Sequence, residues 1–261
     1  MFKNLTGKTI FITGASSGIG RSTAIEFAHA SPQCLRLVLT ARRIEILQEL
    51  AVEINFEAGD GVKKLTVQLD VSKPEEIHSF VERLPERLMI KITTSGLALG
   101  GMAKSPDISV DDLKIMFATN VTGLINMTQA ILPTMLRRNK GDITNLNSIA
   151  GHEAYPGGSI YCATKSAVRT YSDALRRELI GTRICVMEVA PGQVETEFSV
   201  VRFGGDRKAA ERVYEGCEPL TPEDVAEVIV FAANRRENLV VADVLLFPSH
   251  QASVTVLHRK N

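Results

Sequence analysis

The sequence predicts a doubly wound α/β fold, in which helices cover both faces of a parallel sheet. Short apolar runs alternate with longer segments of helical periodicity along the chain. Runs such as 184–187 are apolar at every position, which is typical of strands that are buried on both faces of a parallel sheet. A glycine-rich turn also joins the first apolar run to the first helical segment. Together these patterns favour a parallel sheet over a helical bundle or an antiparallel sandwich.

Each element follows from one of these patterns. We predict strands at 9–13, 35–40, 65–69, 88–93, 142–147, 183–189 and 239–247. Three helical segments begin with patterns typical of a capping box, at Ser72, Ser109 and Thr221. No repeat or linker interrupts the sequence, so we predict one domain over residues 1–261. The segment 195–219 is the least regular, and we predict a mobile lid there.

The composition indicates a small-molecule partner. The 30 Lys and Arg residues balance the 30 Asp and Glu residues, so nothing favours nucleic acid or an anionic membrane as a partner. The four cysteines are scattered and the five histidines are dispersed, so we expect no disulfide framework and no metal. No stretch approaches the length of a membrane span. These observations predict a cytoplasmic protein.

The turn after the first predicted strand carries glycines at positions 14, 18 and 20. Glycine permits a tight turn and lets the backbone approach a pyrophosphate closely, while the following helix offers free N–H groups to phosphate. The spacing differs from G-x-G-x-x-G, and the absence of a Gly-Lys-Ser/Thr ending argues against a P-loop. The position of the turn predicts a dinucleotide site, although glycines of this kind also occur in ordinary turns.

Tyr161 and Lys165 are four residues apart in a predicted helix, and Ser148 lies thirteen positions before Tyr161. Residues at this spacing share a helix face, so Lys165 is expected to lower the pKa of Tyr161 by favouring its phenolate. Lowering the pKa of a tyrosine from about 10 by roughly 3 units requires about 4 kcal/mol. A positively charged nicotinamide ring would supply the part of this free energy that one lysine does not supply. For the Tyr-Lys pair alone, a chance pair on a solvated helix is the alternative.

These motifs resemble the short-chain dehydrogenase/reductase family, whose signatures are T-G-x-x-x-G-x-G and a Ser with Tyr-x-x-x-Lys. The segment 13–20, Ser148, Tyr161 and Lys165 match in order and at family spacing. The resemblance runs from about Leu5 to the C-terminus and implies a Rossmann fold with a seven-stranded sheet. Segments 142–151, 155–161, 194–199 and 247–253 are most similar to NADP-dependent 3-hydroxy acid dehydrogenases, also called serine 3-dehydrogenases.

The end of the second predicted strand favours NADP over NAD. Enzymes that prefer NAD commonly carry a carboxylate here for the ribose hydroxyls. This chain has Arg42 and Arg43 instead, at the start of a helix, where guanidinium groups suit a phosphate. The alternative is two solvated arginines. The turn, these arginines and the resemblance together assign the cofactor contacts to Gly14, Ser16, Ser17, Gly18, Ile19, Gly20, Arg42, Arg43, Asp70, Val71, Gly96, Asn120, Tyr161, Lys165, Pro191, Gly192, Val194 and Thr196. Asp70 has a rival role as a helix cap.

The resemblance implies interconversion of a small 3-hydroxy acid, of the serine or allo-threonine type, and its 3-oxo acid. Tyr161 would exchange the proton, Ser148 would orient the substrate oxygen, Lys165 would hold the ribose, and Asn120 would position a water. We expect Arg202 to bind the substrate carboxylate, with Gln193 as a second candidate. The alternatives are a carbonyl reductase of a larger ketone or sugar and a non-catalytic NADP-binding protein.

The fourth predicted strand departs from the family pattern. Where the family has Asn-Asn-Ala-Gly, this chain has Thr93, Thr94, Ser95 and Gly96, and Lys91 stands in the strand itself. This departure is the observation that supports the non-catalytic alternative, because the usual asparagines support the floor of the cofactor site. The resemblance also implies a homotetramer, formed through the long predicted helices 111–136 and 159–179.

Overall fold

The structure is a computed structural model that describes residues 5–33, 35–83, 90–94 and 98–260. Its strands are β1 (Thr9–Thr13), β2 (Arg36–Ala41), β3 (Lys63–Gln68), β4 (Ile90–Thr94), β5 (Gly141–Leu146), β6 (Ile184–Pro191) and β7 (Asp243–Leu246). They form one sheet in the order β3-β2-β1-β4-β5-β6-β7, and every neighbouring pair is parallel. The Rossmann-like α/β class predicted from the sequence is confirmed.

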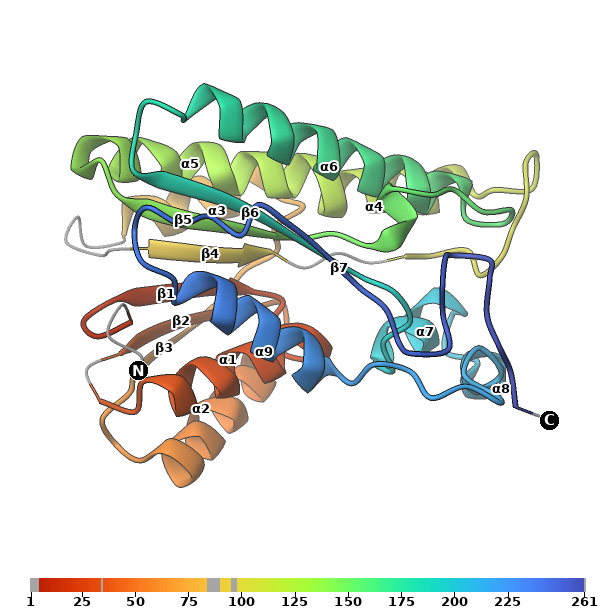
Figure 1. Cartoon of the computed structure of the whole chain (residues 1–261), viewed down its shortest axis with the longest axis horizontal. Coiled ribbons are helices and arrows are strands. Elements are labelled where there is room, and N and C mark those ends of the chain that lie inside the picture. Colours follow the sequence, from red (N-terminus) through yellow and green to blue (C-terminus); the bar gives the residue numbers. More distant parts are fainter. Residues whose placement is uncertain (1–4, 34, 84–89, 95–97, 261) are drawn as a thin grey trace.

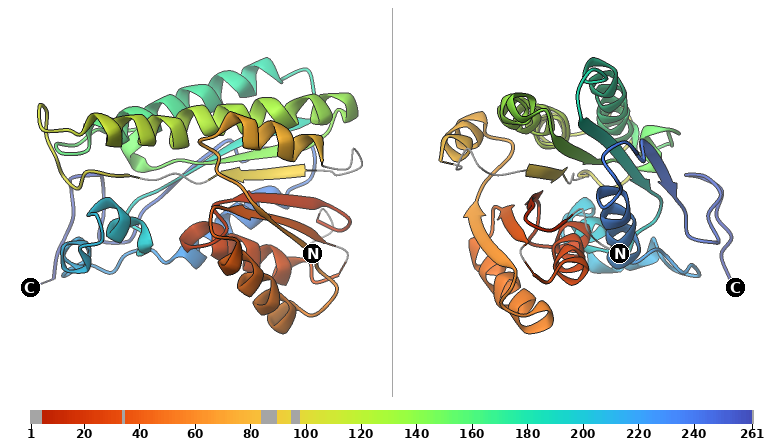
Figure 2. Two further views of the ribbon diagram at one scale, coloured as in Figure 1. Left: turned by 180° about the vertical axis from the view of Figure 1, so that it is seen from behind. Right: turned by 60° about the vertical axis from the view of Figure 1, so that its left-hand side comes forward.

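Helices cover both faces of the sheet (Figures 1 and 2). On one face lie α1 (Gly18–Ala30), α2 (Ile44–Ala58) and α9 (Pro222–Ala233). On the other face lie α3 (Pro74–Glu82), α5 (Leu124–Arg138) and α6 (Ser159–Glu178). The helix α4 (Val110–Phe117) continues through a π-helical turn, η1 (Ala118–Gly123), into α5. The predicted helical segments 111–136 and 159–179 correspond closely to this run and to α6.

The alternation of side chains along β1 explains why the whole strand is apolar. Ile10 and Ile12 belong to the core beneath α1, α2 and α9, whereas Phe11 belongs to the core on the other face. Successive side chains of a strand point to opposite faces, so a strand covered on both sides needs apolar residues at both sets of positions. Phe11 also stacks on Phe80 of α3, with ring centroids 5.3 Å apart. The two cores therefore pack on both faces of the central strands and fix the position of the carboxyl edge of the sheet.

Two of the three predicted helix starts are correct. Thr221 forms a full capping box with Asp224, and the Ser109 hydroxyl accepts a hydrogen bond from the Asp112 N–H. The capping box predicted at Ser72 is wrong, because α3 begins at Pro74 after Lys73. The Asp70 carboxylate instead accepts hydrogen bonds from both the N–H and the hydroxyl of Ser72. Asp70 thus shapes the turn between β3 and α3.

The strand β4 forms in spite of its unusual sequence. Its backbone pairs with β1 on one side and β5 on the other, and Lys91 stands opposite Ile10 and Asp142 in the register. The departure from the family motif therefore leaves the strand pairing intact. Ser95 and Gly96 lie outside the described residues, so the predicted contact of Gly96 with a cofactor remains a prediction.

One continuous helical run, Val110–Arg138, is long and apolar enough to cross a membrane by length and composition alone. It has 29 residues, a mean hydropathy of 1.2 in its most apolar window, and 39% of that window is buried. The prediction that no stretch approaches the length of a span is therefore wrong by this criterion. Met127, Ile131 and Met135 from this run pack in the core with the strands. A core helix passes the same test, so we attribute its apolar character to packing on the sheet.

The predicted lid contains two short helices, α7 (Glu197–Arg202) and α8 (Arg207–Arg212). They lie beyond the carboxyl ends of the strands, with the C-terminal end of the chain beside α8 (Figure 1). The Lys260 N–H donates a hydrogen bond to the Gly216 carbonyl, which ties the tail to this region. Ligands of doubly wound proteins bind at this edge of the sheet.

Candidate active site

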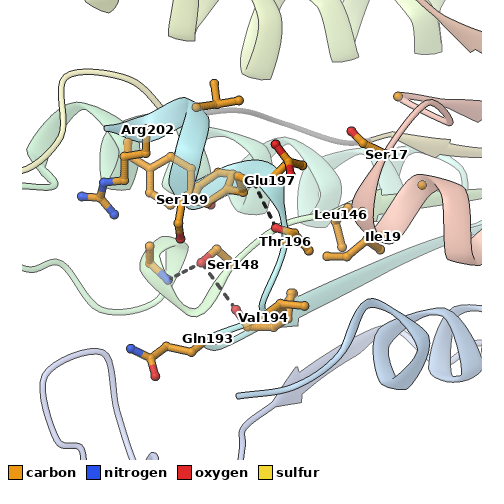
Figure 3. A pocket seen from close by; sticks show the side chains of 18 of the residues that line it. Ser17, Ile19, Leu146, Ser148, Gln193, Val194, Thr196, Glu197, Ser199 and Arg202 are labelled. Atoms are coloured by element: carbon orange, nitrogen blue, oxygen red, sulfur yellow. Dashed lines mark hydrogen bonds between the residues drawn. The ribbon is translucent and has the colours of Figure 1, made fainter. Parts of the chain in front are cut away.

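A cavity of about 870 Å³ opens at the carboxyl edge of the sheet, between the glycine turn and α7. Figure 3 shows Ser17 and Ile19 of the turn at one end, Arg202 at the other, and Ser148 between them. The predicted site residues that line this cavity are Gly14, Ser16, Ser17, Gly18, Ile19, Gly20, Arg42, Arg43, Asp70, Val71, Ser148, Tyr161, Lys165, Pro191, Gly192, Gln193, Val194, Thr196 and Arg202. Of the other two predicted residues, Asn120 is described below and Gly96 is outside the described residues.

The glycine turn requires its glycines for two different reasons. Gly14 and Gly18 have φ values of 65° and 50°, in the left-handed region that favours glycine. At Gly20, a Cβ atom would lie only 2.4 Å from the carbonyl oxygen of Gly14. The side chain of Ser17 makes no capping hydrogen bond at the start of α1. The first N–H groups of α1 are therefore available to an anion at the wall of the cavity.

Arg42 and Arg43 follow β2 and extend the positive end of the cavity. Both are exposed, and Arg43 is the N-cap residue of α2. Its Nη2 donates a hydrogen bond of 3.1 Å to the hydroxyl of Ser16, which belongs to the glycine turn. Two guanidinium groups thus stand beside the free N–H groups of α1, an arrangement that suits a ligand with several phosphates.

Ser148 lies at the centre of the cavity wall, directly after β5. Its hydroxyl oxygen accepts a hydrogen bond of 3.1 Å from the Ala150 N–H, which begins the short helix η2 (Ile149–Gly151). The same hydroxyl donates a hydrogen bond of 3.5 Å to the Pro191 carbonyl, and its interaction with the Tyr161 phenol lowers the pKa of that phenol. The predicted Ser148 and Tyr161 therefore lie in the wall of one cavity and interact there.

Lys165 is buried behind Tyr161. Its Nζ donates a hydrogen bond of 2.9 Å to the Leu146 carbonyl and lies 5.8 Å from the centroid of the Tyr161 ring. Burial lowers the pKa of Lys165 to about 8, and the charge of Glu188 acts in the opposite direction. The pKa of Lys165 therefore lies close to neutral pH, so small changes in its surroundings alter how much of it is protonated.

Burial also raises the pKa of Tyr161 above its usual value, while the hydrogen bond from Ser148 lowers it. The prediction that Lys165 would lower this pKa is therefore wrong for the chain without a bound cofactor. The physical reason is that loss of solvent disfavours the phenolate more than its polar neighbours favour it. A further positive charge is needed beside the ring before Tyr161 releases a proton near neutral pH.

Asn120 lies behind the cavity wall in the π-helical turn η1. Its Nδ2 donates a hydrogen bond of 3.1 Å to the Thr164 hydroxyl, and that hydroxyl donates one of 2.8 Å to the Tyr161 carbonyl. The side chain is buried and does not line the cavity. Direct contact with a cofactor, as the sequence predicted, does not fit this position. Asn120 instead braces α6 between Tyr161 and Lys165.

Arg202 crosses from α7 to two loops on the other side of the cavity. Its Nε donates to the Gly101 carbonyl at 2.8 Å, its Nη1 to the Tyr155 hydroxyl at 2.9 Å, and its Nη2 to the Gly157 carbonyl at 3.4 Å and to the Met102 sulfur. The guanidinium also lies 5.5 Å from the centroid of the Tyr155 ring. Arg202 is thus a firmly held cation in the cavity wall.

Several residues that line the cavity were not predicted from the sequence. Tyr155 holds Arg202, the hydroxyl of Tyr214 is 2.6 Å from that of Ser199, and Gln251 accepts a hydrogen bond from the Gln193 N–H at 2.9 Å. Tyr155 and Gln251 stand in segments that resemble the family, which was a usable signal for both residues. The contact of Gln251 joins residues far apart in the sequence, and no local pattern indicates it. The side-chain Oε1 of Gln193 is buried without a hydrogen-bond partner in the described part of the chain.

His152, Glu188 and Asp243 lie together beneath this wall, with nitrogen and oxygen atoms within 4.8 Å of one another. These residue types bind metals in other proteins. Here Glu188 Oε1 already accepts hydrogen bonds from Asn147 Nδ2 at 2.7 Å and, in one tautomer, from His152 Nε2 at 3.3 Å. We therefore assign no metal to the group, and the absence of a metal remains a prediction.

A phosphate cradle that opens onto a tyrosine and a lysine defines the class of protein: an oxidoreductase built on a dinucleotide-binding fold. The chain belongs to the short chain dehydrogenase family, whose model matches residues 8–203. It is 52% identical over 259 residues to an NADP-dependent 3-hydroxy acid dehydrogenase of Schizosaccharomyces pombe, covering 98% of each chain.

Two further comparisons extend this likeness. The chain is 40% identical over 247 residues to sulfoacetaldehyde reductase 2 of Chromohalobacter salexigens, covering 93% of this chain and 95% of the relative. A solved structure described as the closed form of serine dehydrogenase complexed with NADP+ is 36% identical, with a TM-score of 0.83, and covers 97% of this chain and 100% of that chain. These similarities extend along nearly the whole chain.

Proposed function

We propose that this protein is an NADP-dependent oxidoreductase that interconverts a small 3-hydroxy acid, of the serine or allo-threonine type, and its 3-oxo acid. The observation that carries the proposal is that Ser148, Tyr161 and Lys165 share one cavity with the glycine turn and two arginines. The names of the S. pombe relative and of the serine dehydrogenase structure support both the cofactor and the substrate class.

The residues present fit NADP. At Gly20 a Cβ would meet the Gly14 carbonyl at 2.4 Å, so only glycine lets α1 begin this close to the turn, and the uncapped N–H groups of α1 are available to a pyrophosphate. Arg42 and Arg43 would hold the 2′-phosphate, since they replace the carboxylate that would repel it. When bound, the cofactor supplies or accepts the hydride and adds a positive charge to the cavity in its oxidised form.

The protein's own residues handle the proton and the orientation of the substrate. Tyr161 donates its phenolic proton to the carbonyl oxygen during reduction and accepts it back during oxidation. Ser148 donates a hydrogen bond to the same oxygen, since its hydroxyl lines the same cavity as the Tyr161 phenol. Lys165 holds the ribose and favours the phenolate when the cofactor brings additional positive charge. Asn120 fixes the spacing of Tyr161 and Lys165 through Thr164.

Arg202 is proposed to bind the acid group of the substrate. A guanidinium has five N–H donors, and the four contacts above leave a donor for a carboxylate. The same cation would accept a sulfonate, which is consistent with the name of the C. salexigens relative. Gln193 would contribute its buried Oε1 to a hydroxyl or ammonium group of the substrate.

Paired binding and turnover assays test the function itself. We expect NADP to raise the midpoint of thermal unfolding and the protein to oxidise a 3-hydroxy acid in its presence. Binding of NADP without turnover of hydroxy acids, ketones or sugar alcohols would support the non-catalytic alternative that the altered fourth strand suggested. Turnover confined to larger ketones or sugars would support the other alternative.

The double variant Arg42→Ala/Arg43→Ala should weaken NADP binding by roughly 10- to 100-fold, because charge-assisted hydrogen bonds contribute about 1.5–3 kcal/mol. Binding of NAD should change little, since NAD lacks the 2′-phosphate. Isothermal titration with both cofactors measures the two affinities. Arg36→Ala, an exposed arginine at the opposite end of β2, is the matched control. An unchanged preference for NADP in the double variant would overturn the assignment.

Arg202→Ala should raise KM for a 3-hydroxy acid by roughly 10-fold or more, because a charge-assisted contact to the carboxylate is lost. KM for an uncharged alcohol of similar size should rise much less. Steady-state kinetics with both substrates separates the two effects, and Arg207→Ala, exposed at the start of α8, serves as control. If KM for the acid stays at the wild-type value, Arg202 does not bind the carboxylate.

We also propose that residues 1–261 form one domain, that the protein is cytoplasmic and that it assembles as a homotetramer. Exposed apolar residues on the helical run and on β7 support the assembly, among them Ile115, Leu136 and Leu245. Such residues favour contacts between copies of a chain. Light scattering that detects only a monomer would contradict the tetramer.

A further inference from the structure

Glu188 is a buried carboxylate that the proposed chemistry leaves unused. It lies in the middle of β6 and is 2% exposed. Its hydrogen-bond partners are the amide of Asn147 and the ring of His152, and no Lys or Arg among the described residues forms an ion pair with it. Burying a carboxylate is costly unless nearby groups compensate its charge. Folding therefore does not by itself explain a carboxylate at this position.

Glu188 contacts the segment 146–148, which carries Ser148 and the carbonyl that binds Lys165. Three consecutive residues lie at and just after the end of β5: the Leu146 carbonyl accepts the hydrogen bond from Lys165, Asn147 Nδ2 donates to Glu188 at 2.7 Å, and Ser148 lowers the pKa of Tyr161. The Asn147 N–H also donates to the Val189 carbonyl at 2.7 Å. Asn147 thus fastens the segment to β6 by two bonds, one of which ends on Glu188.

The groups that face Glu188 come from four elements. Lys165 approaches from α6, His152 from the end of η2, Asn147 from the end of β5, and Asp243 from β7. Asp243 is exposed, so water and salt screen its charge, whereas the charge of Glu188 acts through the protein interior. The charge of Glu188 raises the pKa of Lys165 against the effect of burial. Glu188 is thus a buried carboxylate whose charge acts on Lys165.

We propose that Glu188 is a positioning residue for the reaction: through Asn147 it holds the segment 146–148, which carries Ser148 and the Leu146 carbonyl to which Lys165 is hydrogen-bonded. This inference rests on the proposed function of the same site. Glu188 touches neither the cavity nor the substrate, because it is absent from the cavity wall formed by the described residues. Its effect passes through Lys165 and Tyr161.

The charge effect has a definite sign. Removing a negative charge disfavours protonated Lys165 and favours the phenolate of Tyr161, so the pKa of each group falls. Carbonyl reduction needs Tyr161 in its phenol form and Lys165 in its charged form. The alkaline limb of the pH profile, where kcat for reduction falls, should therefore move to lower pH when the charge of Glu188 is removed.

Glu188→Gln tests this directly, because glutamine keeps the shape and an oxygen acceptor for Asn147 but loses the charge. We expect the alkaline midpoint of kcat for reduction with NADPH to fall by about half a pH unit or more. KM for NADPH should stay near the wild-type value. Asp243→Asn removes the same formal charge at an exposed position and should shift the midpoint less. Glu188→Asp keeps the charge and should keep the midpoint while lowering kcat.

Glu188→Met, an apolar residue of similar volume, provides a second variant if the glutamine variant does not fold, and it should show the same shift. Titration of Lys165 by NMR follows the same link without turnover and should move in the same direction. A wild-type protein without turnover would count against the proposed function alone, because the NMR titration still tests Glu188. Midpoints and Lys165 titration equal to wild type in both charge-removing variants would overturn the inference.

Discussion

Tyr161→Phe should lower kcat for carbonyl reduction by about 10²- to 10⁴-fold, the usual contribution of a positioned general acid. The substitution keeps the aromatic ring, which packs against Phe198 with centroids 5.5 Å apart, and removes only the phenolic hydroxyl. Ser148 can still orient the substrate oxygen, but the cavity then lacks a proton donor at that oxygen. Affinity for NADP should stay within a few-fold of the wild-type value, because the ring and Lys165 remain.

Tyr155→Phe is the matched control for this experiment. Tyr155 lines the same cavity, and its hydroxyl contacts Arg202 rather than Ser148. Its loss should therefore act mainly on KM for an acidic substrate and leave most of kcat intact. Measuring kcat and KM for both variants distinguishes proton transfer from positioning. Activity of Tyr161→Phe within a few-fold of wild type would eliminate Tyr161 as the acid.

Lys165→Met should abolish most turnover and yet stabilise the folded protein at neutral pH. Lys165 is 3% exposed, and burial lowers its pKa from 10.5 to about 8. Below pH 8 the lysine is protonated in both states, and folding must bury its charge. That cost corresponds to about 3 kcal/mol at 1.36 kcal/mol for each pKa unit, and the lost hydrogen bond to Leu146 offsets roughly 1 kcal/mol of the gain.

The pH dependence follows from the same pKa values. Between the folded pKa of about 8 and the ordinary value of 10.5, the unfolded chain binds more protons at this residue, so the stability of the wild-type protein rises with pH there. The advantage of Lys165→Met should therefore be largest below pH 8 and shrink towards pH 10. Urea unfolding at both pH values measures it. Lys114→Met, at an exposed position on α4, should show no such change.

A lower stability of Lys165→Met than wild type at pH 7 would contradict the claim that this lysine is held at an energetic cost. Such a cost is expected where function, rather than folding, determines the residue. Retained turnover in the same variant would be inconsistent with the role proposed for Lys165.

The sequence predicted those parts of the site whose geometry depends on residues close together in the chain. The glycine turn was predictable because steric demands at Gly14, Gly18 and Gly20 act within a few residues. The residues from Pro191 onward were assigned by the resemblance to the family, and they join Ser148 because the carboxyl ends of parallel strands meet at one edge. Tyr161 and Lys165 were predictable as a pair because helical spacing places them on one face.

The remaining features depend on contacts between distant segments. The π-helical turn that places Asn120 behind α6 has no simple signal in the apolar pattern, which reads as one continuous helix. Arg202 was expected to face a substrate, but its bonds to Gly101 and Tyr155 arise only when α7 packs across the cavity. The raised pKa of Tyr161 likewise follows from burial in the finished fold. The contact between Glu188 and His152 requires β6 and η2 to meet, which no short window contains.

The most direct test of the whole account is the formation of NADPH when the purified protein is given NADP+ and a panel of 3-hydroxy acids, sulfonated alcohols, uncharged alcohols and sugar alcohols. We expect that a small 3-hydroxy acid such as serine or allo-threonine gives the highest kcat/KM, that NADP+ is preferred over NAD+, and that Tyr161→Phe abolishes the signal. A protein that binds NADP+ but oxidises no member of the panel, or one that prefers NAD+, would contradict it.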